Sequence, residues 1–280
     1  MRSIVQPDIQ GDASPGAPPE SAGTIRILYS DDEIVVIDKP PAMLTHSNSF
    51  DHHTPTVLMV LGSMMGKSIR TVHRLDRMTT GVMVAALTPD AARILSDQFR
   101  DRSVTKRYLA IVRGHLDDSG TIGTPVSRPS TGEELFAETD YTVLGRGVLP
   151  VAVGAYDEAW FSLVDLTLHT GRTHQARRHL QSINHPVLGD NKHGDKTYNR
   201  FAAARYGERH LFLRAYELCF DHPVTGGSAD ADPSAAGSGA TRRRVVACAG
   251  IPELWLRVLD DMGIEVPAGL ATQASVRVAE

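Results

Sequence analysis

An aspartate between two arginines is the first group in the chain that could do chemistry. Residues 73–81 read His-Arg-Leu-Asp-Arg-Met-Thr-Thr-Gly, which places Asp76 between Arg74 and Arg77, just before an apolar run. A loop beside a buried strand can present a carboxylate to a cleft, and nearby guanidinium groups favour the ionised form that a nucleophile or general base needs. A surface ion pair would have the same composition, so the residues alone leave both interpretations open.

A second polar cluster lies much further along the chain. Residues 170–179 read Thr-Gly-Arg-Thr-His-Gln-Ala-Arg-Arg-His, and Thr173 is a candidate N-cap for a helix. The free N–H groups at the start of such a helix, together with Arg172, would favour a phosphate. Arg177 on the same helix could instead pair with a carboxylate. A basic helix that only faces solvent is the alternative.

Sequence signatures of metals and nucleotide cofactors are missing. The chain has 12 histidines, but His174 and His179 are five apart on the expected helix, and His52 and His53 point apart in an extended segment. There is no complete Gly-x-x-x-x-Gly-Lys-Ser/Thr loop, no Gly-x-Gly-x-x-Gly and no Gly-x-Ser-x-Gly. Two cysteines are too few for a disulfide scaffold. We therefore expect no cofactor and no metal, and chemistry carried by side chains alone.

Charge is distributed unevenly along the chain. The formal net charge is -4, yet residues 67–107 hold nine basic and four acidic residues, and residues 172–214 hold nine and three. These two segments carry +5 and +6, which leaves -15 for the remainder. They would form one positive face for nucleic acid if the fold brings them together. Scattered, solvated charges are the alternative.

Apolar patterning predicts the elements that must position these clusters. We expect strands over residues 25–39 (as a hairpin), 81–88, 106–112, 160–169, 211–220 and 243–248, and helices over 57–65, 89–100, 173–183 and 252–262. No apolar run is long enough to span a bilayer. The expected organisation is a disordered leader (1–23), a catalytic domain (24–265) with a flexible insert (226–241), and a loose tail (266–280).

Several motifs, in order, resemble the RluA-type pseudouridine synthases. The hallmark is His-Arg-Leu-Asp followed by a Thr-(Ser/Thr)-Gly-Val run, here residues 73–84. Lys106-Arg107-Tyr108, the cluster at 170–177 and the segment 185–190 match in the same order, as does the opening hairpin at 27–40. Together the matches span nearly all of the chain that is expected to be ordered.

The resemblance implies isomerisation of uridine to pseudouridine in structured RNA, without a cofactor. It also implies an α+β fold, with a mixed, mainly antiparallel sheet and an active-site cleft across its middle. Asp76 matches the catalytic aspartate, which starts cleavage of the N-glycosidic bond by adding to the sugar or by taking a sugar proton. Tyr108 matches the tyrosine that packs on the target base and can help remove the C5 proton, and Arg177 matches the arginine paired with the aspartate.

RNA contacts are also implied by the resemblance and by the basic segments. Arg74 matches the arginine that fills the space left by the flipped nucleotide. The full set expected to contact RNA is Arg74, Arg77, Lys106, Arg107, Arg172 and His174. An enzyme that acts on a base must first take it out of its stack, so basic and aromatic groups around one carboxylate suit this chemistry.

Details of the sequence resemble the TruC subgroup, which modifies position 65 in the acceptor/TΨC arm of tRNA. The basis is the run 190–195 with Asn199 and Arg200, and the segment 44–46. Three residues depart from the usual pattern: His193 in place of Tyr, Ala176 in place of Leu or Ile, and Arg214 in place of His.

Other functions stay open on the sequence alone. A ribosomal-RNA or dual-specificity synthase would share the chemistry, whereas an RNA-binding or RNA-chaperone protein would need the basic segments but not Asp76. An aspartate-dependent nucleosidase would release free uracil and would not need those segments. We expect tRNA as the partner, no membrane partner, a monomer and a cytoplasmic location.

Overall fold

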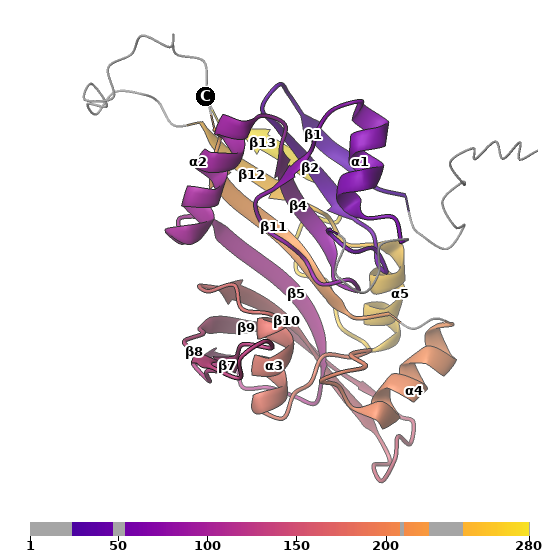
Figure 1. The fold of residues 1–280 in the computed structure, drawn as a ribbon. Helices are drawn as coiled ribbons and strands as arrows, with labels where there is room; N and C mark the ends of the chain where they lie inside the picture. The colour runs from indigo at the N-terminus through magenta and orange to yellow at the C-terminus, as the bar shows by residue number, and fades with distance from the viewer. Residues whose placement is uncertain (1–23, 47–53, 208–209, 224–242, 280) are drawn as a thin grey trace, which may run out of the picture.

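The structure is a computed structural model that describes residues 24–46, 54–207, 210–223 and 243–279. Its strands are β1 (Arg26–Ser30), β2 (Ile34–Lys39), β3 (Arg70–Thr71), β4 (Thr80–Ala86), β5 (Thr105–Arg113), β6 (Ser119–Ile122), β7 (Val126–Ser127), β8 (Glu134–Leu135), β9 (Thr139–Leu149), β10 (Ala159–Leu168), β11 (Leu213–Asp221), β12 (Arg244–Cys248) and β13 (Ser275–Val278). Its helices are α1 (Val57–Met65), α2 (Pro89–Arg100), α3 (Gln175–Ser182), α4 (Lys196–Tyr206) and α5 (Glu253–Asp261) (Figure 1).

One 11-stranded sheet dominates the fold. Its strands follow the order β1-β2-β4-β11-β5-β10-β9-β6, while β3 pairs with β4 and β12 joins β11 to β13. Among the described strands, β4 and β11 form the single parallel pair, and all other pairs are antiparallel. The sheet is therefore mixed and mainly antiparallel, which confirms the predicted fold class. Strands β7 and β8 form a separate hairpin.

Helices cover both faces of this sheet. Alternate residues of a strand point to opposite faces, so Ile34 and Val36 pack with α2, whereas Val35 and Ile37 pack with α1. In the other half, α3 packs on one face, and α4 and α5 cover the other. The central strands are buried on both sides, which is why they read as continuous apolar runs in the sequence.

The parallel junction of β4 and β11 depends on a glycine and a buried arginine. Gly81 has φ +112°, and a Cβ there would lie 2.0 Å from the carbonyl oxygen of Ala215, so only glycine allows this approach. Arg214 donates to Asp38 at 2.6 Å and to the carbonyl oxygen of Gly250 at 2.8 Å. This residue, which departs from the family pattern, therefore joins strands β2 and β11 to the loop after β12.

The structure confirms the predicted elements to within two residues at their ends. Residues 266–280 were expected to be loose, but they include β13, which pairs with β12. Patterning missed α4, β3 and β6–β9. The predicted leader (1–23) and insert (226–241) lie outside the described residues. None of the helices in the described ranges has the length and apolar character needed to cross a bilayer.

Candidate active site

A cavity of about 480 Å³ lies against β5, near the middle of the sheet. Its wall is formed by the loop before β4, by the end of α2 and the loop after it, by β5, and by the loop that leads from β10 into the start of α3. The two polar clusters of the sequence, 73–81 and 170–179, therefore meet at one site. Seven of the nine predicted site residues line it: Arg74, Asp76, Lys106, Tyr108, Arg172, His174 and Arg177.

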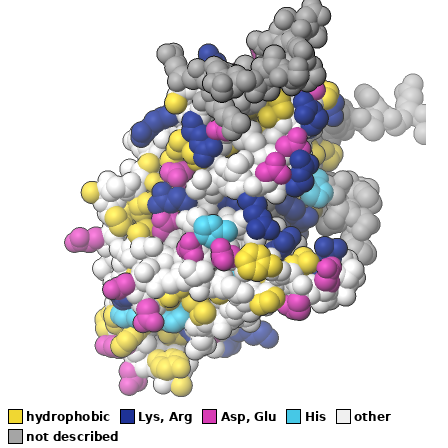
Figure 2. All heavy atoms as spheres, turned by 90° about the vertical axis from the view of Figure 1, so that its left-hand side faces the viewer, with side chains coloured by type: hydrophobic (Ala, Val, Ile, Leu, Met, Phe, Trp, Pro, Cys, Tyr) yellow, Lys and Arg dark blue, Asp and Glu magenta, His cyan; other side chains and the backbone are white. Residues whose placement is uncertain are grey.

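The cavity wall is basic and contains one carboxylate. Its Arg and Lys residues are Arg74, Arg100, Arg102, Lys106, Arg172 and Arg177. Among the described residues of the wall, Asp76 is the single acidic side chain. Figure 2 shows Lys and Arg side chains gathered across the middle of the side on which α2, β7 and β8 lie. The wall therefore suits a polyanion with one group that can act as nucleophile or base.

An arginine from the other cluster holds Asp76. The Nη1 atom of Arg177 donates to Oδ2 of Asp76 at 3.1 Å, although the two residues are 101 apart in the sequence. The flanking Arg74 and Arg77 make no ion pair with Asp76 in the described structure, and Nε of Arg77 donates to the carbonyl oxygen of Ala42 at 3.1 Å. The charge partner is therefore the arginine implied by the family resemblance, not a sequence neighbour.

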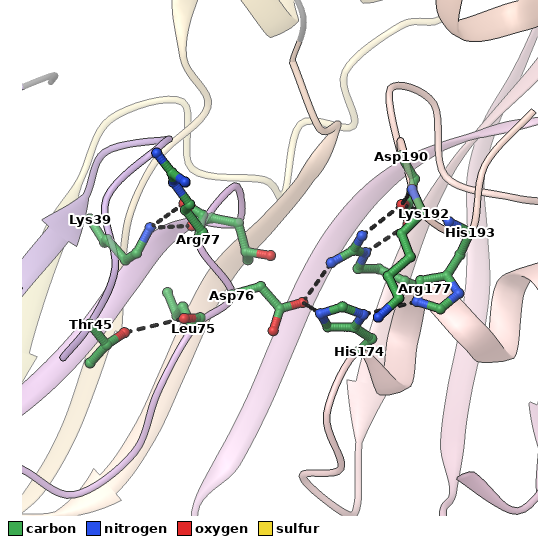
Figure 3. A network of polar contacts seen from close by, with 11 residues as sticks. Lys39, Thr45, Leu75, Asp76, Arg77, His174, Arg177, Asp190, Lys192 and His193 are labelled. Carbon is green, nitrogen blue, oxygen red and sulfur yellow. Dashed lines mark hydrogen bonds and ion pairs between the residues drawn. The ribbon is translucent and has the colours of Figure 1, made fainter. Parts of the chain in front are cut away.

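Arg177 is itself fixed by a second carboxylate, Asp190. Its Nε and Nη2 atoms each donate to an oxygen of Asp190 at 2.6 Å, and the backbone N–H groups of Lys192 and His193 donate to the same carboxylate at 2.9 Å. Burial opposes both charges, but these hydrogen bonds outweigh it, so the pKa of Asp190 is lowered and the pKa of Arg177 is raised. Both groups stay charged, and Nη1 remains directed at Asp76 (Figure 3).

Gln175 fixes the loop before α3, and the predicted cap at Thr173 is wrong. The side-chain oxygen of Gln175 accepts from Oγ1 of Thr170 at 2.6 Å and from the backbone N–H of Arg172 at 3.0 Å. His174, not Thr173, is the N-cap residue, with φ 57° and no side-chain capping bond. The buried glutamine therefore holds the turn that brings His174 to the cavity.

Two histidines extend the network around Asp76 (Figure 3). Nε2 of His174 lies 3.8 Å from Oδ2 of Asp76, and Nδ1 of His174 lies 2.8 Å from Nε2 of His193. Burial lowers the pKa of both rings, that of His193 to about 4, so both are neutral at pH 7 and one donates to the other. No cluster of three or more His, Cys, Asp or Glu side chains suited to a metal occurs in the described part of the chain.

Strand β5 presents alternate side chains to the cavity. Lys106 and Tyr108 line it, whereas Arg107 pairs with Glu217, the residue opposite it on β11, and with Asp165 on β10, which lies opposite Leu109. This is the period of two that a strand imposes. The structure therefore does not bring Arg107 into the cleft, and it leaves Arg77 outside the cavity wall as well.

Tyr108 lines the cavity as a neutral phenol. Burial, reinforced by the negative charge of Asp76, raises the pKa of Tyr108 above its usual value. The hydroxyl therefore keeps its proton at neutral pH, and the ring offers an aromatic surface beside the carboxylate.

A buried lysine that sequence reasoning did not single out holds the Asp76 loop. Lys39 is 0% exposed, and its ammonium donates to the carbonyl oxygens of Pro40 at 2.9 Å, Arg77 at 3.0 Å and Thr79 at 2.9 Å (Figure 3). Burial lowers the pKa of Lys39 to about 7, against the opposing effect of Asp76. The signal in the sequence was a charged residue that ends an apolar strand directly before two prolines.

The sequence matches a known family over most of the region that builds this site. Residues 33–182 match the family described as RNA pseudouridylate synthase. This range is more than half of the chain and includes Asp76, Tyr108 and Arg177. The chain belongs to this family. It is therefore an RNA pseudouridine synthase, an isomerase that acts on uridine in RNA.

Curated relatives of this synthase share most of its length. The tRNA pseudouridine synthase C of Pasteurella multocida (strain Pm70) is 36% identical over 248 residues, which cover 85% of this chain and 96% of that protein. The tRNA pseudouridine synthase C of Yersinia pestis is 39% identical over 218 residues, which cover 72% of this chain and 83% of that protein.

Solved structures of pseudouridylate synthases have the same fold. Human RNA Pseudouridylate Synthase Domain Containing 1 superposes with a TM-score of 0.58 at 27% identity, covering 72% of this chain and 81% of that chain. Human RNA Pseudouridylate Synthase Domain Containing 4 superposes with a TM-score of 0.61 at 24% identity, covering 86% of this chain and 94% of that chain. The second likeness shows the fold alone.

Proposed function

We propose that this synthase converts a uridine of tRNA to pseudouridine, at position 65 in the acceptor/TΨC arm. The relatives named tRNA pseudouridine synthase C support tRNA as the substrate, because the chain covers 96% and 83% of two of them. The position rests on the resemblance of residues 190–195 and 44–46 to the TruC subgroup. We further infer that the enzyme works as a monomer in the cytoplasm, without a metal.

One observation carries the assignment of the catalytic group. Asp76 is the lone carboxylate among the described residues of a basic cavity wall, and Arg177 fixes its orientation at 3.1 Å. We assign to Asp76 the first attack on the ribose of the target nucleotide. By adding to C1′ or by taking a proton from C2′, it leads to cleavage of the bond between C1′ and N1 of uracil. Arg177 balances the charge of the carboxylate while it is desolvated by the substrate.

The freed uracil must turn inside the cavity before it is joined again. A bond then forms between C5 and C1′, C5 gives up its proton and N1 gains one, so the net change is an isomerisation. We assign to Tyr108 the surface on which the base packs, because an aromatic ring suits a flipped base. The raised pKa of Tyr108 favours this packing role over a phenolate that takes the C5 proton.

The basic side chains of the wall, together with the neutral His174, suit the RNA backbone around the flipped nucleotide. We assign phosphate and sugar contacts to Arg74, Lys106, Arg172 and His174, and Arg74 fills the space that the base vacates. Arg100 and Arg102 line the same wall and join this set, although the sequence did not point to them. Arg107 is left out, because it is neutralised by two carboxylates, one on each of the strands that flank β5.

Mapping of pseudouridine in cellular RNA tests this proposal. Total tRNA and ribosomal RNA are incubated with the wild-type enzyme or with Asp76→Ala, and carbodiimide adducts are located by primer extension. We expect one stop that depends on Asp76, at position 65 of a tRNA. A stop in ribosomal RNA only would refute the substrate, and no stop that depends on Asp76 in either pool would refute the catalytic assignment.

A further inference from the structure

A large aromatic side chain is exposed beside the active site without a role in the core. Phe136 is 56% exposed and directly follows β8, the second strand of the β7–β8 hairpin. Its neighbour Ala137 is fully buried, so the chain turns a small residue inward and the phenyl ring outward. Phe136 makes none of the ring contacts found between described aromatic side chains, whereas the exposed Trp160 packs against the ring of His115.

The segment that carries Phe136 is fastened to the cavity wall. Nε of Arg172 donates to the carbonyl oxygen of Phe136 at 3.0 Å. Two residues on, the N–H of Glu138 donates to Oγ1 of Thr170 at 3.0 Å, and the carbonyl oxygen of Glu138 accepts from Gln175 at 2.9 Å. The three wall residues in these bonds all line the cavity. The backbone that carries the exposed ring is therefore held at a fixed place next to the wall.

The hairpin itself is also tied to α3, the helix that carries Arg177. Arg178 donates to the carbonyl oxygen and to the hydroxyl of Ser127 on β7, both at 2.8 Å. His179 contacts the carbonyl oxygen of Thr124 at 2.9 Å. The position of Phe136 is thus coupled to the same helix that orients the catalytic pair.

We propose that Phe136 is a stacking platform for a base of the substrate RNA next to the target uridine. Phe136 is not part of the wall of the 480 Å³ cavity, so it does not contact the target base itself. Arg172, which lines the wall and bonds to the backbone of Phe136, lies where a phosphate between the two nucleotides would pass. Unstacked bases of RNA bind to exposed aromatic rings, and such stacking tolerates any base. This inference rests on the proposed action at a flipped uridine.

Variants at this position separate stacking from general apolar contact. Phe136→Ala removes the ring, Phe136→Leu keeps an apolar side chain without a π face, and Phe136→Trp keeps the aromatic surface. Tyr156→Ala is the matched control, because Tyr156 is also an exposed aromatic residue, at 64%, but lies far from the cavity. Tyr156 precedes the first residue of β10, whereas the last residue of β10, Leu168, lines the cavity. The ten residues of β10 separate its two ends by about 30 Å.

The readouts are the Kd for tRNA, from filter binding, and release of tritium from tRNA that carries [5-³H]uridine. We expect Phe136→Ala and Phe136→Leu to raise Kd and KM about tenfold with kcat and Tm nearly unchanged, and Phe136→Trp and Tyr156→Ala to behave as wild type. Wild-type Kd in Phe136→Ala, or full rescue by Leu, would overturn the stacking role. Unchanged Kd with an altered oligomeric state would assign the ring to a protein contact and also overturn it. Failure of the wild type to release tritium would defeat the proposed substrate, while the ratio of Kd values would still decide the role of Phe136.

Discussion

Replacement of Asp190 by Asn gives the sharpest test of how the site is built. Asp190→Asn keeps the shape of the side chain but removes its charge. The side chain is 0% exposed, and it accepts two bonds of 2.6 Å from Arg177. An amide presents one oxygen and one NH2 group to the guanidinium, so one of the two bonds becomes a contact between two donors. Arg177 is then a buried cation with a weakened partner.

The expected loss is large because the pair is desolvated. Removing one partner of a buried ion pair typically costs about 3–5 kcal/mol, and for a protein of this size that lowers Tm by about 6–20 °C. Arg177 also loses the contact that directs its Nη1 atom to Asp76. A shift of about 1 Å in a catalytic group can cost about 100-fold in rate, so we expect turnover to fall by about that factor.

Asp261→Asn is the matched control for this variant. Asp261 also accepts two bonds of 2.6 Å from one arginine, Arg205, but its side chain is 31% exposed and it lies outside the cavity wall. Exposed pairs contribute at most about 1 kcal/mol, so Tm should change little and turnover should not change.

Thermal unfolding followed by circular dichroism gives the stability of both variants, and tritium release under single-turnover conditions gives the rate. The pH dependence of the difference in Tm between wild type and Asp190→Asn gives a second test. Because the folded pKa of Asp190 is lowered, its stabilisation is complete above the unfolded pKa of about 3.9 and is lost as the pH falls through the folded pKa. The difference in Tm between wild type and Asp190→Asn should therefore shrink below about pH 4. A loss in Asp190→Asn no larger than in Asp261→Asn, with normal turnover, would refute the reasoning.

Three further perturbations probe other parts of the site. Arg172→Gln should reduce the slope of log Kd for RNA against log salt by roughly 0.7–0.9, whereas Arg107→Gln should not, because its charge is already neutralised; equal slopes in a salt titration would contradict this. Lys39→Met should lower the free energy of unfolding by about 3 kcal/mol or more, because three carbonyl oxygens lose their donor. An unchanged Tm in calorimetry would contradict this prediction. His174→Phe and His193→Phe should each slow single-turnover conversion. The increase in activation free energy in the double variant should be smaller than the sum of the two single increases, and additive increases would rule out a coupled pair.

The central strands could be predicted from the sequence because burial on both faces leaves long apolar runs, as in residues 81–86. The segment from 119 to 149 could not, since β6–β9 are short or rich in polar and small residues with no clear period. Helix α4 was missed for lack of an apolar stripe, although Asp195 accepts from the first-turn N–H groups and Gly207 ends the helix in a left-handed conformation. These two capping residues could have been recognised in the sequence.

The site residues also divide into those that the sequence could predict and those that it could not. The pairing of Asp76 with Arg177 joins residues 101 apart, and no local spacing could reveal it, so the family resemblance supplied it. The orientation of Arg107 could have been predicted, because successive side chains of a strand point to opposite faces and Lys106 and Tyr108 share the cavity face. The sequence marks Lys39 only as a charged residue that ends an apolar strand before two prolines, and its role depends on three carbonyls that the fold brings together.

Replacement of Asp76 by Asn tests the central claim most directly. The side chain is 19% exposed and takes one bond from Arg177, so the variant should fold normally and bind tRNA with a Kd within about threefold of wild type. Tritium release from [5-³H]uridine in tRNA, measured together with this Kd, should fall below detection. Continued release, or a loss of binding as large as the loss of turnover, would contradict the assignment of Asp76 as the group that starts the reaction.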